Sequence, residues 1–537
     1  MFGNYLKIAI RNLLRHKVYS VINIFGLAVG MAACIVILLW VRFNLSFDRF
    51  HSNAGRICQL FEHQNFPGSN PRETDCTMPA MGPALKSDYP EVEEFCRIKE
   101  VPDYLVVWNG DKGFTADNAL LTDPSFLKIF DFRPVSGRLK GAMDDPNSLV
   151  LTVEFARKIF DGADPVGKTL EVCYKDQRVS LQVSAVIESP PANSSLQFDL
   201  VAPLSVKEQS SPGWLSQWGS NEPYTYLLLS PGADYKVLEK KIDRELLARY
   251  NPASDKYIGL YLLPLKQVRL RSPLTSGPSL SQLLLFAGIA LVILLVACIN
   301  FTNLSLARLS GRAREVGLRK TVGASRFQLI CQFLVESMLQ TMLALLLAIV
   351  LVELALPWLN PHLGYTLRFN YLTDWLLPVL VLPAALFVGI LTGLYPSLII
   401  SSFRLTSILK GQSGPGPGRH TLRRALIVAQ FTVSTVLIIG TMITVRQLDY
   451  LLHKDIGLDK EQVVCLPLNT EMSNRFESLR TELLQQPGVV AVTGQRHGLW
   501  GRMHTTTRLG FEGQVAGSFE SQYLEYLLVD YDFIRFY

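Results

Sequence analysis

Residues 162–169 come closer to a known chemical site than any other part of this sequence. Gly162-Ala-Asp-Pro-Val-Gly167-Lys168-Thr169 fits the pattern G-x-x-x-x-G-K-[ST], in which backbone amides and a lysine bind nucleotide phosphates. Such a loop needs a buried strand before it and a helix N-terminus after it. Here residues 153–160 read as a helix, and residues 170–174 alternate like a strand. We therefore interpret Gly162, Gly167, Lys168 and Thr169 as a helix-to-strand turn that binds no cofactor.

The cysteines show no pattern that indicates a metal site. No C-x-x-C pair and no Cys/His spacing typical of zinc is present. Cys34, Cys298 and Cys331 lie in or beside apolar segments and are interpreted as small apolar residues. Five others lie in segments that we expect outside the membrane, where one or two disulfides can form in an oxidising compartment. They are Cys58, Cys76, Cys96, Cys173 and Cys465, and the sequence does not define their pairing.

Two histidines have acidic residues near them in the sequence and would be the candidates for hydrolase chemistry. They are His51 and His63, with Asp48 and Glu62 close by. We interpret them as surface residues, because no further nucleophile or base stands at a suggestive spacing. The sequence thus predicts a non-catalytic chain, with an outer-domain hydrolase as the enzyme class left open.

Apolar segments long enough to cross a membrane set the class of the protein. The chain of 537 residues is 49% hydrophobic, and five apolar segments each reach about 20 residues, the length that spans a bilayer. They are residues 18–42, 281–305, 329–356, 374–401 and 425–446. The first contains Gly26 and Gly30, a G-x-x-x-G pair that lets two helices approach closely, although glycine is also common in spans generally.

Ionisable residues inside these segments are scarce. Glu336 and Glu353 stand near opposite ends of the third span, where we expect their side chains to reach an interface. No line of charged residues crosses the bilayer, which argues against an ion-coupled transporter.

Residues 1–17 predict an amphipathic helix at the membrane surface. Leu6, Ile10, Leu13 and Leu14 share one helical face, and the basic residues fall away from it. The apolar segment that follows is too long for a signal peptide, so we expect it to be retained as an anchor.

Basic residues in short loops predict the orientation. Before Glu336, the stretch from Ala307 to Ser337 has a single acidic residue, Glu315, and six basic ones: Arg308, Arg312, Arg314, Arg319, Lys320 and Arg326. Residues 402–424 are also basic and contain a flexible Gly-Pro-rich linker. Short basic loops stay in the cytoplasm. We therefore expect the N-terminus, 306–328 and 402–424 inside, and residues 43–275 and 447–537 outside. The basic residues show no aromatic interleaving typical of nucleic-acid binding.

The outer segment, residues 43–275, reads as a mixed α and β domain. Strand-like runs cover 56–61, 148–152, 181–187 and 224–229. Helix-like runs cover 81–88, 153–160 and 235–250. Turn clusters rich in proline and asparagine separate them.

The C-terminal part of the chain repeats the start. Arg15-His16, the first span and Val41-Arg42 match Arg419-His420, the fifth span and Val445-Arg446. The phrase LLTDPSFLKIF from Leu120 matches LLVDYDFIRFY from Leu527. Because the second copy stops there, we interpret the sequence as a fragment of a duplicated chain. The alternative is a natural protein of five spans with a short outer tail.

The basic stretch also carries a specific phrase, R-E-V-G-L-R-K followed by V-G-A-S and an amphipathic run. This resembles the cytoplasmic coupling segment of the FtsX/MacB-type ABC transporter permeases. Gly393-Leu-Tyr-Pro-Ser397 and Leu409-Lys-Gly411 resemble the end of a span and the exit that follows it in that family. The resemblance covers most of the chain, and the repeat is similar to that of two-repeat permeases.

The resemblance implies an α-helical transmembrane protein of the inner membrane, with five spans, a large α+β MacB-like extracytoplasmic domain and the start of a second. It implies that ATP and Mg²⁺ bind a separate cytosolic ATPase dimer. The residues implied to contact that ATPase are Glu315, Gly317, Arg319, Lys320, Gly323 and Ala324. Other implied partners are membrane lipid, a periplasmic adaptor or substrate protein, and a second permease or a second copy.

The implied function is export or extraction of a substrate, driven by motion that the ATPase transmits through the coupling segment. Two alternatives stay open. One is an FtsX-like regulator that activates a periplasmic partner without transport. The other is a self-sufficient ATP-binding protein that uses residues 162–169. The sequence does not identify the substrate.

Overall fold

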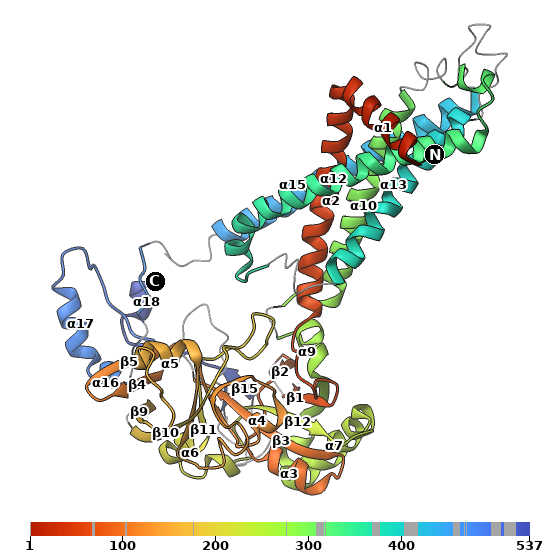
Figure 1. Ribbon diagram of the computed structural model, residues 1–537. Coiled ribbons are helices and arrows are strands. Elements are labelled where there is room, and N and C mark those ends of the chain that lie inside the picture. The colour runs from red at the N-terminus through yellow and green to blue at the C-terminus, as the bar shows by residue number, and fades with distance from the viewer. Residues whose placement is uncertain are drawn as a thin grey trace. The chain divides into compact units, whose positions relative to one another are not determined.

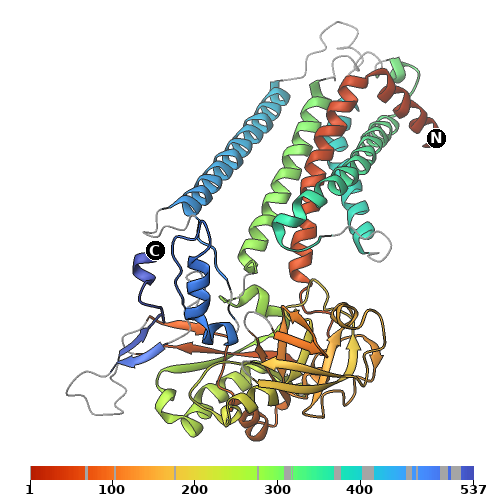
Figure 2. The same ribbon diagram turned by 90° about the vertical axis from the view of Figure 1, so that its left-hand side faces the viewer.

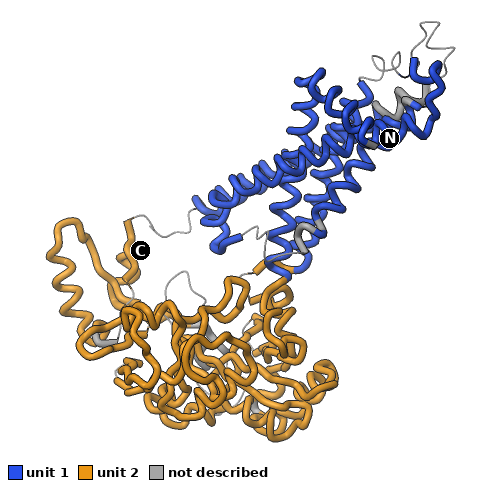
Figure 3. The backbone as a smooth tube through the Cα atoms, viewed as in Figure 1, with its two compact units in different colours: residues 1–45, 280–454 blue, residues 46–279, 455–537 orange. Residues whose placement is uncertain are grey.

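The structure is a computed structural model. It describes residues 2–66, 70–101, 105–174, 177–274, 277–307, 316, 318–367, 376–401, 417–454, 462–466, 468, 470–495, 506–509 and 522–537. The chain divides into two compact units (Figure 3), one formed by residues 1–45 and 280–454 and the other by residues 46–279 and 455–537.

The first unit is helical. Its elements are α1 (Phe2–Arg15), α2 (Lys17–Leu45), α10 (Leu280–Ala307), α12 (Arg326–Leu363), α13 (Leu376–Ser401) and α15 (Pro417–His453). Within the described residues, α2, α10, α12, α13 and α15 contain five segments long and apolar enough to cross a membrane. The predicted five-span class is therefore confirmed. The amphipathic helix α1 turns away from the axis of α2, as both Figure 1 and Figure 2 show.

Small residues let these helices pack closely. The core of the unit includes Leu27 and Ala28 of α2 and Ala344 and Ala348 of α12, all almost fully buried. A Cβ atom at Gly30 would stand 2.6 Å from the Cβ of Ala297 on α10, and one at Gly26 would stand 3.5 Å from Asn300 Nδ2. The two helices thus approach where the G-x-x-x-G pair lies, an approach that a side chain at residue 30 would obstruct.

The helix that contains the third predicted span, residues 329–356, extends beyond both ends of that span. The structure continues α12 through Pro357 and Pro361 to Leu363, where Gly364 takes φ +72° and caps it. A helix that leaves a membrane keeps its other backbone groups paired by continuing, so the prolines do not end it.

The second unit is built on a mixed sheet of thirteen strands within the described residues. They are β1 (Ile57–Gln64), β2 (Arg72–Thr74), β3 (Val92–Glu100), β4 (Leu105–Asn109), β5 (Lys112–Ala116), β6 (Ala119–Thr122), β7 (Pro134–Gly137), β8 (Ser148–Thr152), β9 (Thr169–Tyr174), β10 (Gln177–Ile187), β11 (Leu200–Pro203), β12 (Tyr224–Leu229) and β13 (Ile258–Pro264). The main order is β13-β1-β12-β3-β6-β11-β8-β10-β9-β4-β5, with β2 on β1 and β7 on β10. Most pairs are antiparallel, whereas β10 with β8 and β11 with β6 are parallel.

Helices cover both ends of this sheet. They are α3 (Met81–Asp88), α4 (Phe126–Ile129), α5 (Val153–Phe160), α6 (Ser205–Ser210), α7 (Tyr235–Tyr250), α8 (Pro252–Asp255) and α9 (Leu265–Arg271), with a short turn η1 at Trp214–Ser216. One core lies under α3 and α7, against β1, β12 and β13, and another lies under α5, against β8 and β10. Three helices, α3, α5 and α7, begin and end where the sequence pattern predicted.

A buried ion pair crosses the middle of the sheet. The Arg97 guanidinium donates to both carboxylate oxygens of Asp123, at 2.9 and 2.8 Å, and the Arg97 amide donates to Oδ2 at 2.8 Å. Because both side chains are nearly enclosed, the remaining donors also need partners, and Nη1 donates to the Pro79 carbonyl at 2.8 Å.

The interpretation of His51 as a surface residue is wrong, since its side chain is buried, as are the two nearby acids, Asp48 and Glu62. The His51 ring packs edge-on against Phe130 and accepts a hydrogen bond at Nδ1 from the Asp131 amide, 3.0 Å away. Burial lowers the pKa of His51 to about 4, so the ring is neutral. Asp48 accepts from the amide of Ser195 at 2.7 Å. These polar groups complete turns inside the fold, which residue type alone did not reveal. His63, in contrast, is half exposed, with Nδ1 2.7 Å from Glu73.

Glu62 is a fully buried carboxyl on β1. Its Oε2 accepts hydrogen bonds from Gln64 Nε2 at 2.8 Å and from Asn221 Nδ2 at 2.5 Å. Burial raises the pKa of Glu62 to about 7, although these two donors and the charge of Arg72 oppose the shift. The carboxyl is therefore half protonated near neutral pH.

The C-terminal part of this unit contains α16 (Thr470–Asn474), α17 (Phe476–Leu484), β14 (Thr506–Leu509), β15 (Gln522–Glu525) and α18 (Phe533–Phe536). Its hydrogen bonds resemble those around Asp123. The Gly494 amide donates to Asp530 Oδ2 at 3.0 Å, and the Asp530 amide donates back to the Gly494 carbonyl at 3.0 Å. Arg97 and Asp123 exchange the same two bonds, at 2.8 and 3.2 Å. A short helix begins three residues after each aspartate, α4 in one case and α18 in the other.

All eight cysteines are free thiols in this structure. Cys58 and Cys96 are buried in the second unit, which we call the outer unit. Burial raises the pKa of each thiol. Neither is poised as a reactive thiolate.

Close packing at Gly30 predicts a specific defect and its repair. Gly30→Ala in the full-length chain in detergent should lower Tm, because the added Cβ overlaps Ala297, and overpacking of this kind costs about 1–3 kcal/mol. Adding Ala297→Gly should restore most of the loss. Gly288→Ala is the control, since nothing lies within 4 Å of a Cβ there. Equal Tm values for all variants would contradict the packing described.

Burial of Glu62 predicts a pH-dependent stability. The folded pKa of about 7 lies above the ordinary value of 4.5. The folded state therefore holds the proton more tightly, and the free energy of unfolding falls as pH rises from 4.5 through 7, by about 3 kcal/mol. Glu62→Gln should remove this part of the decline and stabilise the outer unit at pH 8 relative to wild type. Denaturant unfolding at pH 5.5 and 8 measures it, with the exposed Glu188→Gln as control. A pH slope identical in wild type and Glu62→Gln would refute the assignment.

Candidate coupling site

The basic stretch lies between the end of α10 and the start of α12. Of the six residues expected to contact an ATPase, the structure describes Arg319, Lys320, Gly323 and Ala324. Glu315 and Gly317 lie outside the described residues. We call residues 316 and 318–327 the coupling segment.

One side of the coupling segment is fixed to the bundle. Val316 is buried with Leu329 and Phe333 of α12 and Ile399 of α13. The Arg319 guanidinium donates to the side-chain oxygen of the buried Gln332. These contacts hold the segment against the first turns of α12 and the last turns of α13.

Lys320 binds the end of a helix. Its Nζ donates to the carbonyl oxygen of Ser401, the last residue of α13, at 2.7 Å. The last carbonyls of a helix have no partner within it, and a cation near them is favoured by the helix dipole. Partial burial, with the nearby charge of Arg326, lowers the pKa of the Lys320 ammonium.

The segment then turns into α12. Gly323 takes φ +96°, a left-handed conformation that a β-carbon disfavours, and the Ala324 amide donates to the Arg319 carbonyl at 3.0 Å. Ser325 forms a capping box with Gln328, in which Gln328 N donates to Ser325 Oγ at 3.3 Å and Ser325 N donates to Gln328 Oε1 at 3.0 Å. These bonds set where α12 begins.

Three large apolar side chains of the coupling segment are exposed. Leu318, Val322 and Phe327 are 72%, 84% and 75% exposed. Sequence reasoning chose the charged residues and the glycines and missed these three. The available signal was the i, i+4 spacing of Leu318 and Val322 among residues that are otherwise polar. The segment thus exposes apolar side chains, whereas Arg319 and Lys320 donate hydrogen bonds to α12 and α13.

Glu336, which we expected to reach a membrane interface, bonds to helix α1. It is buried on α12, and its Oε2 accepts a hydrogen bond from Asn12 Nδ2 of α1 at 3.4 Å. Gln332, one turn earlier, is the residue that accepts from Arg319. Polar side chains in this part of α12 therefore join α1 and the coupling segment to the same helix.

Residues 162–169 form the turn that the sequence predicted. Helix α5 precedes them and strand β9 follows them. The Gly167 amide donates to the Val183 carbonyl at 2.8 Å and so belongs to the sheet, and the Lys168 ammonium lies 4.9 Å from the centroid of the Phe160 ring. A helix thus precedes the turn and a strand follows it, the reverse of the order in a phosphate-binding loop.

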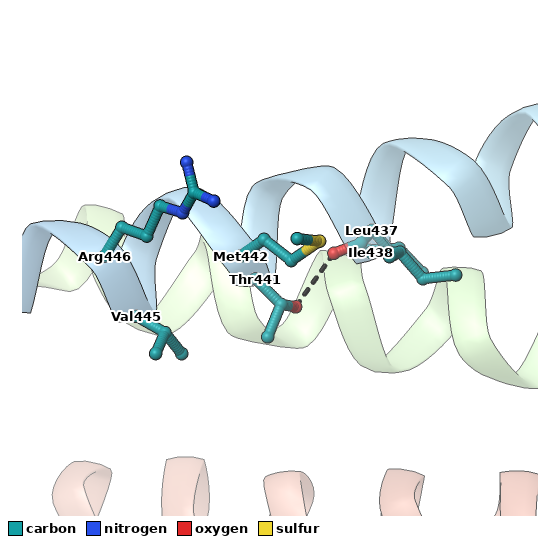
Figure 4. Close-up of a pocket in the computed structure, with 6 residues that line it drawn as sticks. All are labelled: Leu437, Ile438, Thr441, Met442, Val445 and Arg446. Carbon is teal, nitrogen blue, oxygen red and sulfur yellow. Dashed lines mark hydrogen bonds between the residues drawn. The ribbon is translucent and has the colours of Figure 1, made fainter.

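A shallow hollow lies on α15, and Figure 4 shows the six residues that line it. They are Leu437, Ile438, Thr441, Met442, Val445 and Arg446. The Thr441 hydroxyl donates to the Leu437 carbonyl of its own helix at 2.8 Å, as the dashed line marks. The hollow therefore presents a mainly apolar helix face, as expected of a membrane-embedded surface.

Two family models match the chain. The MacB-like periplasmic core domain matches residues 20–245, and the FtsX-like permease C-terminal domain matches residues 287–404. The second match includes the coupling segment and both helices to which it is fixed.

Curated relatives agree with these matches. The chain is 27% identical over 233 residues to "Macrolide export ATP-binding/permease protein MacB" of Aggregatibacter actinomycetemcomitans, covering 43% of this chain and 34% of that protein. It is 23% identical over 333 residues to "Pyoverdine export ATP-binding/permease protein PvdT" of Pseudomonas syringae pv. syringae (strain B728a), covering 59% and 46%. It is 21% identical over 361 residues to "Uncharacterized ABC transporter permease YknZ" of Bacillus subtilis (strain 168), covering 62% and 81%.

The chain spans about a third to a half of the length of the MacB and PvdT proteins that it matches. Its matched parts are the periplasmic core domain and the permease domain, and five of its helices are long and apolar enough to cross a membrane. This chain is a multi-pass membrane protein that belongs to the FtsX/MacB-type permeases of ABC transporters.

Proposed function

We propose that this chain is the permease subunit of an ABC-type transporter, which transmits ATP-driven motion of a separate ATPase to its periplasmic domain to export or extract a substrate. The observation that carries the proposal is the two-sided coupling segment. One side is bonded to α12 and α13, and the other exposes Leu318, Val322 and Phe327. An exposed apolar cluster on a short polar loop is typical of a protein interface.

The bonds on the inner side explain how motion would pass on. A force on the segment would act on the start of α12 through Gln332 and on the end of α13 through Ser401. Helix α12 has 38 residues, so it would carry a displacement over about 57 Å. A hydrogen-bonded helix is stiff along its axis, which suits this role.

The names of two relatives suggest the energy source and the type of work. MacB and PvdT are named as ATP-binding/permease proteins for macrolide and pyoverdine export. We propose that ATP and Mg²⁺ bind a separate cytosolic ATPase dimer, and that this chain has no catalytic role. The basic stretches support an N-terminus and coupling segment in the cytoplasm and a location in the inner membrane. Further proposed partners are a periplasmic adaptor or substrate protein, and a second permease or a second copy.

A regulator of the FtsX type, which activates a periplasmic partner without transport, is the alternative function. The observation that favours it is that Glu336, a buried carboxyl in the third span, accepts a hydrogen bond from Asn12 of α1. Both functions would use the coupling segment in the same way. A bound periplasmic protein, in place of a translocated substrate, distinguishes the regulator.

We also infer that residues 470–537 begin a second copy of the outer domain. The supporting observation is the pair of backbone and carboxylate bonds that Gly494 and Asp530 share with Arg97 and Asp123. Bridges at matching positions, Gln495 to Val529 and Ile98 to Thr122, add to it. The aspartate in each case joins two extended segments and the short helix that follows.

The exposed apolar cluster predicts the site of ATPase binding. In a pull-down with a candidate ABC ATPase from the same source, Leu318→Ser, Val322→Ser and Phe327→Ser together should lower capture at least tenfold, because the interface loses its apolar centre. Membrane insertion and Tm should stay unchanged, since these side chains are exposed.

The matched control is Val237→Ser on α7, where an exposed apolar residue is removed from the outer unit. Capture by the control and by wild type but not by the triple variant supports the proposal. Equal capture of all three chains would show that the ATPase binds elsewhere.

The second-copy inference predicts equivalent roles for two aspartates. Asp530→Ala should speed hydrogen exchange of amides in 489–495 and 526–537, and Asp123→Ala should do the same in 92–98 and 119–130, because each carboxylate holds two segments together. Asp449→Ala, an exposed residue of α15, is the control. Unchanged exchange around residue 530 would contradict the equivalence.

A further inference from the structure

Helix α1 has one face fixed to the bundle. Ala9 is 1% exposed, and Asn12 donates to Glu336 of α12 at 3.4 Å. Tyr19 and Ser20, just beyond the helix, are also tied down, because the Tyr19 hydroxyl donates to Ser305 Oγ at 3.0 Å and Ser20 Oγ donates to the Leu13 carbonyl at 3.2 Å. The position of α1 is therefore set by α12 and by the start of α2.

The remaining surface of α1 carries two adjacent stripes. Leu6, Ile10 and Leu14 are exposed and repeat every four residues, so they form an apolar stripe. Each is followed by an exposed basic residue, and Lys7, Arg11 and Arg15 form a second stripe beside the first. Eight residues of helix separate the ends of each stripe by about 12 Å.

We propose that this double stripe binds anionic phospholipids and that Asn12 and Glu336 pass the state of α1 to α12. The apolar stripe fits acyl chains just below the headgroups, and the basic stripe fits lipid phosphates beside them. The charge of the stripe selects the occupant, since Lys7, Arg11 and Arg15 have no acidic residue among them along α1. A zwitterionic surface satisfies the apolar stripe and leaves the basic stripe without a matching charge.

The route to α12 is short. Glu336 lies about three turns after the first residue of α12, and Gln332, one turn closer to that end, holds Arg319 of the coupling segment. A change in the strength with which α1 binds the lipid surface therefore acts on α12, the helix that begins within the coupling segment. Lipid binding itself does not depend on an ATPase, so it can be tested whether or not the proposed function is correct.

Hydrogen exchange of the full-length chain in nanodiscs tests the proposal. The two compositions are phosphatidylcholine alone and an equimolar mixture of phosphatidylcholine and phosphatidylglycerol. We expect the amides of α1 to exchange more slowly in the mixture, by roughly tenfold or more. The reason is that Lys7, Arg11 and Arg15 are attracted to the anionic headgroups. The N-terminal half of α12, residues 326–340, should also become more protected.

Three variants separate the steps. Lys7→Gln, Arg11→Gln and Arg15→Gln together should abolish the difference between the two lipids. Lys236→Gln, Lys240→Gln and Arg244→Gln, which remove three exposed charges at the same spacing from α7, should preserve it. Asn12→Ala should keep the lipid response of α1 and remove that of residues 326–340.

Equal exchange of α1 in both lipids, or a lipid response that persists in the Lys7, Arg11 and Arg15 variant, would overturn the proposed lipid site. A response of α12 that survives Asn12→Ala would overturn the proposed link. Inorganic phosphate added to phosphatidylcholine nanodiscs should not reproduce the effect, and protection by phosphate alone would show that the site binds a free anion in place of a lipid surface.

Discussion

The hydrogen bond from Lys320 to the last carbonyl of α13 is the interaction on which this account depends. Carbonyl groups near the end of a helix attract cations, and here the Lys320 ammonium of the coupling segment donates to the Ser401 carbonyl at 2.7 Å. A few residues later, Ser325 supplies the acceptor that α12 needs at its start. The segment is therefore bonded both to the last described residue of α13 and to the first turn of α12.

This constraint explains the division of residues along the segment. Arg319 and Lys320, which charge alone would place in an interface, are used by the bundle. Among the described residues of the segment, the exposed large apolar side chains are Leu318, Val322 and Phe327, which we propose as the partner surface. Helix α1 shows the same division, with Asn12 bonded inward and two stripes facing outward. Two external inputs, an ATPase and a lipid surface, would thus act on α12 from one end.

Much of the fold could be predicted because it follows from periodicity and length. The spans are set by apolar length, and helices such as α5 and α7 are set by apolar spacing and by caps at Thr152 and Asp234. The order of elements around residues 162–169, a helix before the turn and a strand after it, was also predicted correctly. What could not be predicted depends on distant contacts: the buried His51 ring accepts from the Asp131 amide, far along the chain, and the buried Glu336 accepts from Asn12 of α1. The exposure of Leu318, Val322 and Phe327 was not predicted, because it depends on which residues pack around them in the folded chain.

Site-specific photo-cross-linking from the coupling segment tests the central claim most directly. A benzophenone amino acid at Val322 in the full-length chain, reconstituted with the candidate ATPase, should form a cross-link to the ATPase when it is illuminated, while the same group at Val237 on α7 should form none. Cross-links from Val322 to lipid alone, with the ATPase bound and active in the same sample, would show that this face is not the interface. The mechanical account of the coupling segment would then be wrong.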